Sequence, residues 1–281
     1  MDTLLQPGAA TAPGTVHATL NYLAPGAGAP FVYAYDPPLG MPPRNRGSEP
    51  RRVQIHDARP LMRRLSLDVE GFELRRHDTQ VVDFYDDAEV RRVYYPEVDA
   101  LLRAATGAEK VVIFDHTLRN TETGSNRGAQ LRLAGNQVHN DYTESSARRR
   151  VRDLLPPDEA EARLQRRFLE VNVWRSIAPT PLQAWPLALC DAQSLHGQDL
   201  VVSERRYPDR VGETYVVNFN PQHRWFYFPH MRRDEALLIK CHDSATDGRA
   251  RLSVHSAFED PTTPADAPPR ESVEVRTLVF F

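Results

Sequence analysis

The sequence predicts a mainly β fold of the jelly-roll type, with helices packed on the outside. About eight extended segments, separated by Pro, Asp and Gly turn signals, follow one another from residue 169 to the end of the chain. Proline accounts for 23 of the 281 residues, which disfavours a helical bundle. Because 41% of the residues are hydrophobic and 26% are charged, the chain can bury a sizeable core.

The N-terminal half is expected to be rich in loops and helices. Residues 86–107 predict a helix that begins with Asp86 and ends at Gly107, with either a kink at Pro96 or a division into two short helices. Residues 24–50, full of Gly and Pro, predict a long loop that is either a lid over a bound molecule or a passive surface loop. The other expected elements are a loose arm at 1–14, strands at 15–23, within 51–83 and at 110–117, and a polar loop at 118–135.

The C-terminal half is expected to supply most of the sheet. A short strand (QVHNDYT) precedes one helix at about 145–168. Its segment LPPDEAEARLQRRFLE has acidic residues near one end (Asp158, Glu159, Glu161) and arginines near the other (Arg166, Arg167), which matches a helix dipole. The later strands are LEVNVWRSI, PLALCDA, DLVVSERR, ETYVVNFN, RWFYFP, EALLIKCHDS, RLSVHSAF and ESVEVRTLVFF. No linker is evident, so residues 1–281 are expected to form a single domain, with a loop-rich and helical part at about 1–117 and a β core at about 118–281.

Composition excludes several classes of protein. The net charge of −3 offers no electrostatic surface for nucleic acid as a main ligand. Cys190 and Cys241 are too few for a disulfide framework and indicate a reducing compartment. The N-terminus lacks the pattern of a signal peptide, and no apolar run is long enough to span a bilayer. We therefore expect a cytoplasmic protein with no membrane or nucleic-acid partner.

His139-Asn140-Asp141 is the candidate metal motif. On a strand, residues i and i+2 lie on one face, so His139 and Asp141 would present an imidazole nitrogen and a carboxylate oxygen to one point. A second histidine from a distant strand would complete the facial set of two histidines and one carboxylate that suits non-haem Fe(II) oxygenases. His255 is the first candidate, because it shares a polar, small-residue face of RLSVHSAF; the rivals are His223, His230 and His242.

An oxygenase that uses 2-oxoglutarate also needs a cation for the distal carboxylate of this co-substrate. Arginine suits this task, because its planar fork donates two hydrogen bonds to a carboxylate. Arg270 and Ser272 share one face at the start of the last strand and follow His255. Arg276 lies on the same face and is the second candidate, with Lys240 as a weaker one.

Taken together, these segments resemble a known family. The stretches VHNDYTESSARRRVRDLLP, LEVNVWRSI, PLALCDAQSL, RWFYFPHMRRDEALLIKCHDS, VHSAFEDP and RESVEVRTLVFF span about residues 136–281. They resemble the iron-dependent oxygenases of secondary metabolism grouped around the cephamycin 7α-methoxylation component CmcJ, the AsaB-like hydroxylase/desaturases and the gibberellin desaturase-like proteins. One departure is Ser176, where the family commonly has proline.

The resemblance implies a cupin-like double-stranded β-helix that binds Fe(II), 2-oxoglutarate and O2. It implies a dioxygenase that hydroxylates or desaturates a small molecule and releases succinate and CO2. Carried onto this chain, the iron ligands are His139, Asp141 and His255, and the 2-oxoglutarate residues are Arg270 and Ser272, with Arg276 as the alternative anchor.

Three other functions share these residues. The first is an iron oxygenase that does not use 2-oxoglutarate, and the second is a jelly-roll binding module without catalysis. The third is a zinc hydrolase, against which the lack of a nearby general base argues. The sequence does not indicate the substrate or the oligomeric state.

Overall fold

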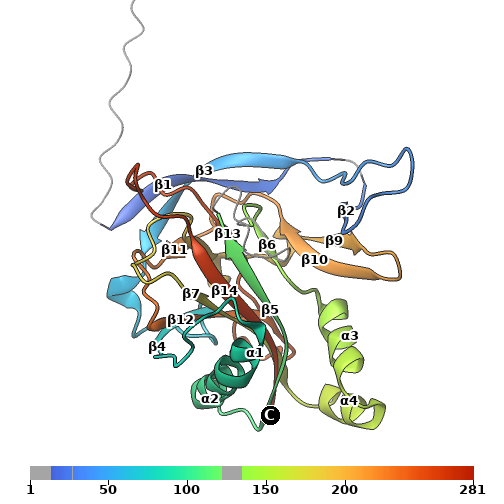
Figure 1. The fold of residues 1–281 in the computed structure, drawn as a ribbon. Coiled ribbons are helices and arrows are strands. Elements are labelled where there is room, and N and C mark those ends of the chain that lie inside the picture. Colours follow the sequence, from blue (N-terminus) through green and yellow to red (C-terminus); the bar gives the residue numbers. More distant parts are fainter. Residues whose placement is uncertain (1–13, 27, 122–134) are drawn as a thin grey trace, which may run out of the picture.

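The computed structural model describes residues 14–26, 28–121 and 135–281, which form two β-sheets with helices packed against them (Figure 1). The expected mainly β, jelly-roll-type fold is confirmed. The predicted arm at 1–14, except its last residue, and most of the predicted polar loop at 118–135 lie outside the described residues. Within the described ranges, no helix has both the length and the apolar character needed to cross a bilayer.

The larger sheet has nine strands in the order β1-β3-β11-β8-β13-β6-β10-β9-β2. Neighbours in this order come from both halves of the chain, so the sheet is held together by long-range pairing. Its strands are β1 (Thr15–Leu23), β2 (Phe31–Tyr33), β3 (Ser48–Asp57), β6 (His139–Asn140), β8 (Leu187–Cys190), β9 (Leu200–Arg206), β10 (Val211–Val217), β11 (Trp225–Tyr227) and β13 (His255–Ala257).

The smaller sheet has five strands in the order β4-β12-β7-β14-β5, all antiparallel. Its strands are β4 (Phe72–Arg76), β5 (Lys110–Asn120), β7 (Phe168–Ser176), β12 (Glu235–Asp243) and β14 (Glu271–Phe280). All eight strands predicted after residue 167 are present. Short 3-10 helices lie at Arg59–Leu61, Ala192–Ser194 and Gly197–Asp199.

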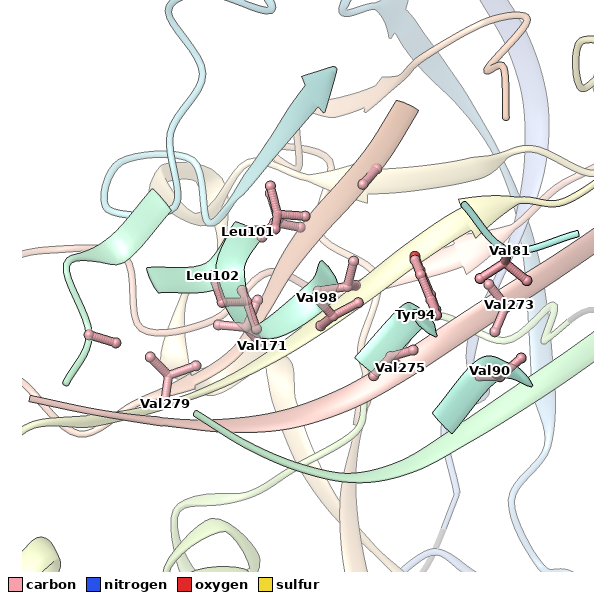
Figure 2. Packing of buried hydrophobic residues seen from close by; sticks show 14 of the residues in the cluster. Val81, Val90, Tyr94, Val98, Leu101, Leu102, Val171, Val273, Val275 and Val279 are labelled. Carbon is pink, nitrogen blue, oxygen red and sulfur yellow. The ribbon is translucent and has the colours of Figure 1, made fainter. Parts of the chain in front are cut away.

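One face of the smaller sheet packs against a helical layer, and alternation along the strands separates this face from the interior. Val171 and Val173 of β7 and Val275 of β14 pack against helix residues such as Val98 and Leu102 (Figure 2). The alternate residues of β7 and β14 point to the opposite face of the sheet. Many of them, such as Asn172 and Glu274, are polar and nevertheless buried. Buried polar side chains need partners, so this inner face is a candidate location for a functional site.

The predicted helix at 86–107 is confirmed and divided. Asp86 caps its start by accepting from the backbone N–H of Ala88 and Glu89, and Gly107 ends it with a left-handed φ of 74°. The three parts are α1 (Asp87–Glu89), a π-helical turn (Val90–Tyr94) and α2 (Tyr95–Thr106). Because Pro96 has no N–H to donate, the wider turn before it is the observed form of the expected kink.

The prediction of one helix at about 145–168 is wrong. The chain forms α3 (Glu144–Leu154) and α4 (Pro157–Leu164), with Leu155 extended between them. Pro156 and Pro157 explain the break, because proline cannot donate the helical hydrogen bond and disfavours helix in the residue before it. Of the charges assigned to one helix dipole, Asp158, Glu159 and Glu161 lie in α4, whereas Arg166 and Arg167 follow its end.

The loop prediction for 24–50 is corrected in part. The segment contains β2, which pairs in parallel with β9, and the first residues of β3. Backbone hydrogen bonds from Tyr33 to Pro43 and from Ala34 to Arg206 fix its course. The polar loop expected from residue 118 also begins later, because β5 continues to Asn120 through its pairing with β14.

Candidate metal centre

The pairing of β6 with β13 brings two histidines together. His255 is the direct antiparallel partner of His139, and their ring centroids lie 4.6 Å apart with an interplanar angle of 55°. Because directly opposite residues of adjacent strands have neighbouring Cβ atoms, this register alone places both imidazoles on one side of the sheet. The same strand β13 pairs with β8 on its other side, where His255 is opposite Leu189.

Asp141 completes the group. Its Oδ1 lies 3.6 Å from His139 Nε2, and one ligand atom each of His139, Asp141 and His255 lies within 4.8 Å of the others. The two-residue strand β6 contains His139 but ends before Asp141, where the backbone bends. The expected strand geometry therefore holds for His139 and not for Asp141. The predicted three residues are nevertheless brought to one point.

The electrostatics keep two of these groups in the forms that bind metal. Burial, with a further contribution from His255, lowers the pKa of His139 to about 4, so its imidazole is neutral near pH 7. Arg276 and the two histidines hold the pKa of Asp141 well below its usual range although burial acts in the opposite direction. A neutral imidazole and an ionised carboxylate are the species that coordinate a metal ion.

Hydrogen bonds orient the ligand atoms. The Nδ1 of His139 lies 2.7 Å from the carbonyl oxygen of Gln137; a carbonyl can only accept, so Nδ1 carries the proton and Nε2 is left to bind metal. Asn172 Nδ2 donates to Asp141 Oδ2 at 2.8 Å, and Arg276 Nε lies 3.5 Å from the same oxygen. Asn172 and Arg276 are direct partners across the β7–β14 ladder, so one pair of residues holds the carboxylate.

The rival histidines lie elsewhere. His223 contacts Tyr22 and Asp199, and His242 lies against Phe168 and is 4.0 Å from Glu144. His230 is exposed in a turn. Among the described residues, His139, Asp141 and His255 are the cluster that could hold a metal ion.

Arg270 and Ser272, the expected co-substrate residues, contact each other on the inner face of the smaller sheet. Arg270 Nε donates to Ser272 Oγ at 3.2 Å, its Nη1 donates to the Trp185 carbonyl at 2.8 Å, and its guanidinium lies 5.2 Å from the ring centroid of Trp174. No carboxylate of the described residues lies within ion-pair distance of it. Burial and the nearby Arg119 lower the pKa of Arg270 to about 9.

The two other candidate cations are already neutralised. Arg276 pairs with Asp115, Asp141 and Glu274, and these carboxylates hold its pKa above the usual value although burial acts in the opposite direction. Lys240 is fully buried and pairs with Asp68 and Asp243. Arg270 is therefore the candidate whose charge lacks a compensating anion in the described structure.

A cavity of about 790 Å³ opens on the candidate metal centre. His139, Asp141 and Arg276 line it, together with residues of β5, β10, α3 and the segment around β2. Arg270 is not one of its lining residues, whereas Arg119 is. A small molecule in this cavity would therefore lie directly against the metal-binding groups.

Asn172 and Gln137 contact the site but were not predicted from the sequence. The signal for Asn172 is its position within LEVNVWRSI, where a polar side chain alternates with Val171 and Val173 in a strand that is buried on both faces. Gln137 acts through its backbone carbonyl and has no sequence signal.

Comparisons with known proteins agree with this geometry. A family model described as "Oxidoreductase/YMDC permease-like domain" matches residues 20–280. The chain is 34% identical over 270 residues to the Fe(II)/2-oxoglutarate-dependent dioxygenase nvfI of Aspergillus novofumigatus, which covers 92% of this chain and 94% of that protein. It is 42% identical over 145 residues to the hydroxylase/desaturase asaB of Aspergillus flavus, covering 47% of this chain and 63% of that protein.

The fold has a solved counterpart. The structure of the iron and alpha-ketoglutarate-dependent endoperoxidase NvfI superposes with a TM-score of 0.87 and 29% sequence identity. The match covers 96% of this chain and 99% of that one.

Proposed function

We propose that this chain, which belongs to the family of Fe(II)/2-oxoglutarate-dependent dioxygenases and AsaB-like hydroxylase/desaturases, oxidises a small molecule of secondary metabolism. The reaction is a hydroxylation or desaturation with O2, and it releases succinate and CO2. The AsaB-like part of the predicted resemblance is confirmed by the relatives, whereas its cephamycin component is supported less specifically.

One observation carries the proposal: ligand atoms of two histidines and one aspartate, from distant parts of the chain, lie within 4.8 Å of one another. Two imidazoles and one carboxylate leave three positions of an octahedral ion open, which is the arrangement of non-haem Fe(II) oxygenases. The residues fit the metal in protonation as well, because His139 is neutral and Asp141 is ionised near neutral pH. We therefore assign Fe(II) to His139, Asp141 and His255.

When bound, iron and 2-oxoglutarate supply the oxidative chemistry, in which O2 converts the keto acid to succinate and CO2 while a C–H bond of the substrate is oxidised. The protein supplies orientation and a shaped cavity. Asn172 and Arg276 hold the carboxylate of Asp141, and the Gln137 carbonyl fixes the tautomer of His139. The residues around the 790 Å³ cavity hold the substrate beside the metal-binding groups.

Arg270 is the proposed anchor of the distal carboxylate of 2-oxoglutarate. A buried guanidinium without a carboxylate partner is costly, and an incoming carboxylate compensates its charge through two hydrogen bonds. Ser272, which already accepts from Arg270, adds a hydroxyl to the same site. Arg276 is assigned instead to the positioning of Asp141, since three carboxylates already surround it.

We further propose that residues 1–281 act as one oxygenase domain in the cytoplasm. Strands of both halves share both sheets, which supports a single domain. Two free, buried cysteines, Cys190 and Cys241, suit a reducing compartment. The net charge of −3 supports a small-molecule substrate rather than nucleic acid, and no membrane partner is proposed.

Anaerobic titration tests the proposal. Fe(II) and 2-oxoglutarate added to the protein should give a weak visible charge-transfer band, because the keto acid chelates the iron. A band with Fe(II) and 2-oxoglutarate in the wild type, and none in His255→Ala with unchanged circular dichroism, is the expected result.

Other results would assign another function. Substrate oxidation that continues without the keto acid would indicate an iron oxygenase independent of 2-oxoglutarate. Tight binding of Zn(II) with ester or amide hydrolysis would indicate a hydrolase, and the absence of any metal binding would indicate a binding module.

A further inference from the structure

The cavity on the candidate metal centre is rich in arginine. Eight arginines line it, against four acidic residues, although the chain as a whole has a net charge of −3. The positive character is therefore a local property of this cavity. Some of this charge is compensated: Arg276 has its three carboxylates, and Arg150 lies 4.0 Å from Asp153.

Three of these arginines, Arg44, Arg46 and Arg205, form a group that we call the arginine cluster. Arg205 lies on β9, where it pairs with Val32 of β2, and Val32 also forms a bridge with Arg44. Arg46 follows in the same segment, and its Nη1 lies 3.4 Å from Ser203 Oγ of β9. The pairing of β2 with β9 thus brings the three side chains to one wall of the cavity.

The arginine cluster lacks compensating charge. None of its members forms an ion pair with a carboxylate of the described residues. Arg205 Nε donates to Tyr207 Oη at 2.9 Å, which is a neutral partner. The Nε of Arg46 is buried without a hydrogen-bond partner in the described part of the chain.

The three charges also repel one another. Burial lowers the pKa of Arg46, and Arg205 and Arg44 lower it further. Buried donors and like charges at one place are costly unless a ligand supplies acceptors and negative charge. An oxyanion would supply both, because the guanidinium fork matches the oxygens of a carboxylate or a phosphate.

We propose that the arginine cluster binds an oxyanion of the substrate, a carboxylate or a phosphate ester, and so orients the substrate in the cavity with its reacting carbon toward His139, Asp141 and His255. This inference rests on the proposed function and names the substrate class of that site. The co-substrate has its own cation, Arg270, which does not line this cavity. The substrate is therefore a small anionic molecule.

Matched probes test the inference. The protein is loaded anaerobically with Fe(II) and 2-oxoglutarate, and binding of 2-naphthoate, 2-naphthyl phosphate and methyl 2-naphthoate is followed by quenching of naphthalene fluorescence. We expect at least one anion to bind at least about tenfold more tightly than the neutral ester. Comparison of the carboxylate with the phosphate identifies the preferred oxyanion.

Variants locate the effect. Arg46→Gln and Arg205→Gln should each weaken anion binding about tenfold and leave the ester unchanged. Arg44 is the exposed member of the cluster, so of the three variants Arg44→Gln should disturb folding least. The matched control is Arg76→Gln, because Arg76 is exposed, pairs with Asp234 and does not line the cavity.

Two outcomes would overturn the inference. The first is equal affinity of the wild type for anions and ester, or equal anion affinity in all variants. The second is a loss of 2-oxoglutarate binding in Arg46→Gln with no loss in Arg270→Gln, because the cluster would then serve the co-substrate. Failure of the proposed function is recognised separately, since the charge-transfer band would be absent from the wild type.

Discussion

His139 and His255 are 116 positions apart in the chain and directly opposite each other in the larger sheet, with ring centroids 4.6 Å apart. The register of two short strands therefore creates the candidate metal centre. The pairing of β14 with β7 supplies the residues that hold the third ligand, because Arg276 and Asn172 are opposite each other and both approach the carboxylate of Asp141.

Replacement of a ligand should remove metal binding without unfolding the protein. His255→Ala and Asp141→Asn each delete one of the three proposed donors, so Fe(II) affinity should fall at least about 100-fold. Isothermal titration with Fe(II) under argon measures this loss. His242→Ala is the matched control, since His242 is also buried but lies outside the cluster; equal loss in that variant would contradict the assignment.

Removal of Arg270 should weaken the binding of 2-oxoglutarate and stabilise the apoprotein. Arg270→Met deletes the proposed anchor, so 2-oxoglutarate should bind at least about tenfold more weakly, by the loss of a bidentate charged contact. The apoprotein should become more stable, because burial and Arg119 disfavour the charged form of Arg270, whose pKa is lowered to about 9. Thermal unfolding with and without 2-oxoglutarate measures both effects, and a less stable apoprotein would argue against an uncompensated charge.

Asn172 is predicted to be a positioning residue. Asn172→Leu removes the hydrogen bond to Asp141 Oδ2, and partners of this kind typically affect metal affinity about 10–100-fold. Fe(II) titration should show this loss, and the charge-transfer band should shift as the carboxylate reorients. Asn220→Leu, which removes an amide bonded to Asp199 away from the site, is the control. An unchanged band and affinity in Asn172→Leu would exclude the positioning role.

Stability of the apoprotein should decline as the pH falls from 6.5 to 4. The unfolded chain binds a proton at His139 with the ordinary pKa of 6.5, whereas burial and His255 lower the folded value to about 4. In that interval the unfolded state binds more protons, so the free energy of unfolding falls with falling pH. Below both values this contribution changes no further.

Urea denaturation at several pH values checks this behaviour. The slope of unfolding free energy against pH measures the number of protons taken up on unfolding, and His139→Asn should reduce this number by up to one. The exposed His230→Asn serves as control. His242 also has a pKa lowered to about 4, so part of the slope remains in the variant. A slope unchanged by His139→Asn would contradict the assignment of a buried neutral imidazole.

The helical layer should affect stability and leave the metal site intact. Leu102 of α2 is fully buried in the cluster that covers the smaller sheet, on the face opposite Asn172 and Arg276. Leu102→Ala should lower the free energy of unfolding by about 2–5 kcal/mol, through lost transfer energy and a cavity. Fe(II) affinity of the folded variant should equal that of the wild type, and a parallel loss of affinity would indicate coupling between the two faces.

Local patterns were sufficient to predict much of the fold. Alternation and turn residues predicted the strands from β7 to β14, and Asp86 and Gly107 marked the ends of the first helical segment. The break between α3 and α4 is the exception: a dipole-like charge pattern favours one continuous helix, but adjacent Pro156 and Pro157 end the first helix. Strand β2 could not be predicted, since its three residues depend on pairing with β9.

Some residues of the candidate site could likewise be predicted from the sequence, and others could not. Residue type and spacing made His139 and Asp141 candidates and His255 the first choice for the third ligand, and the family resemblance assigned all three to iron. The sequence ranked Arg270 before Arg276 as the anchor, but it does not show which carboxylates surround each guanidinium. The arginine cluster is likewise a product of strand pairing between distant segments, and no spacing in the chain indicates it.

A metal-soaked crystal structure tests the central claim most directly. Crystals soaked anaerobically with Fe(II) and measured at the iron absorption edge should show one anomalous peak between His139, Asp141 and His255, with nitrogen and oxygen atoms at about 2.0–2.2 Å. A peak at another set of side chains, such as His242 and Glu144, or no peak at any Fe(II) concentration, would contradict it.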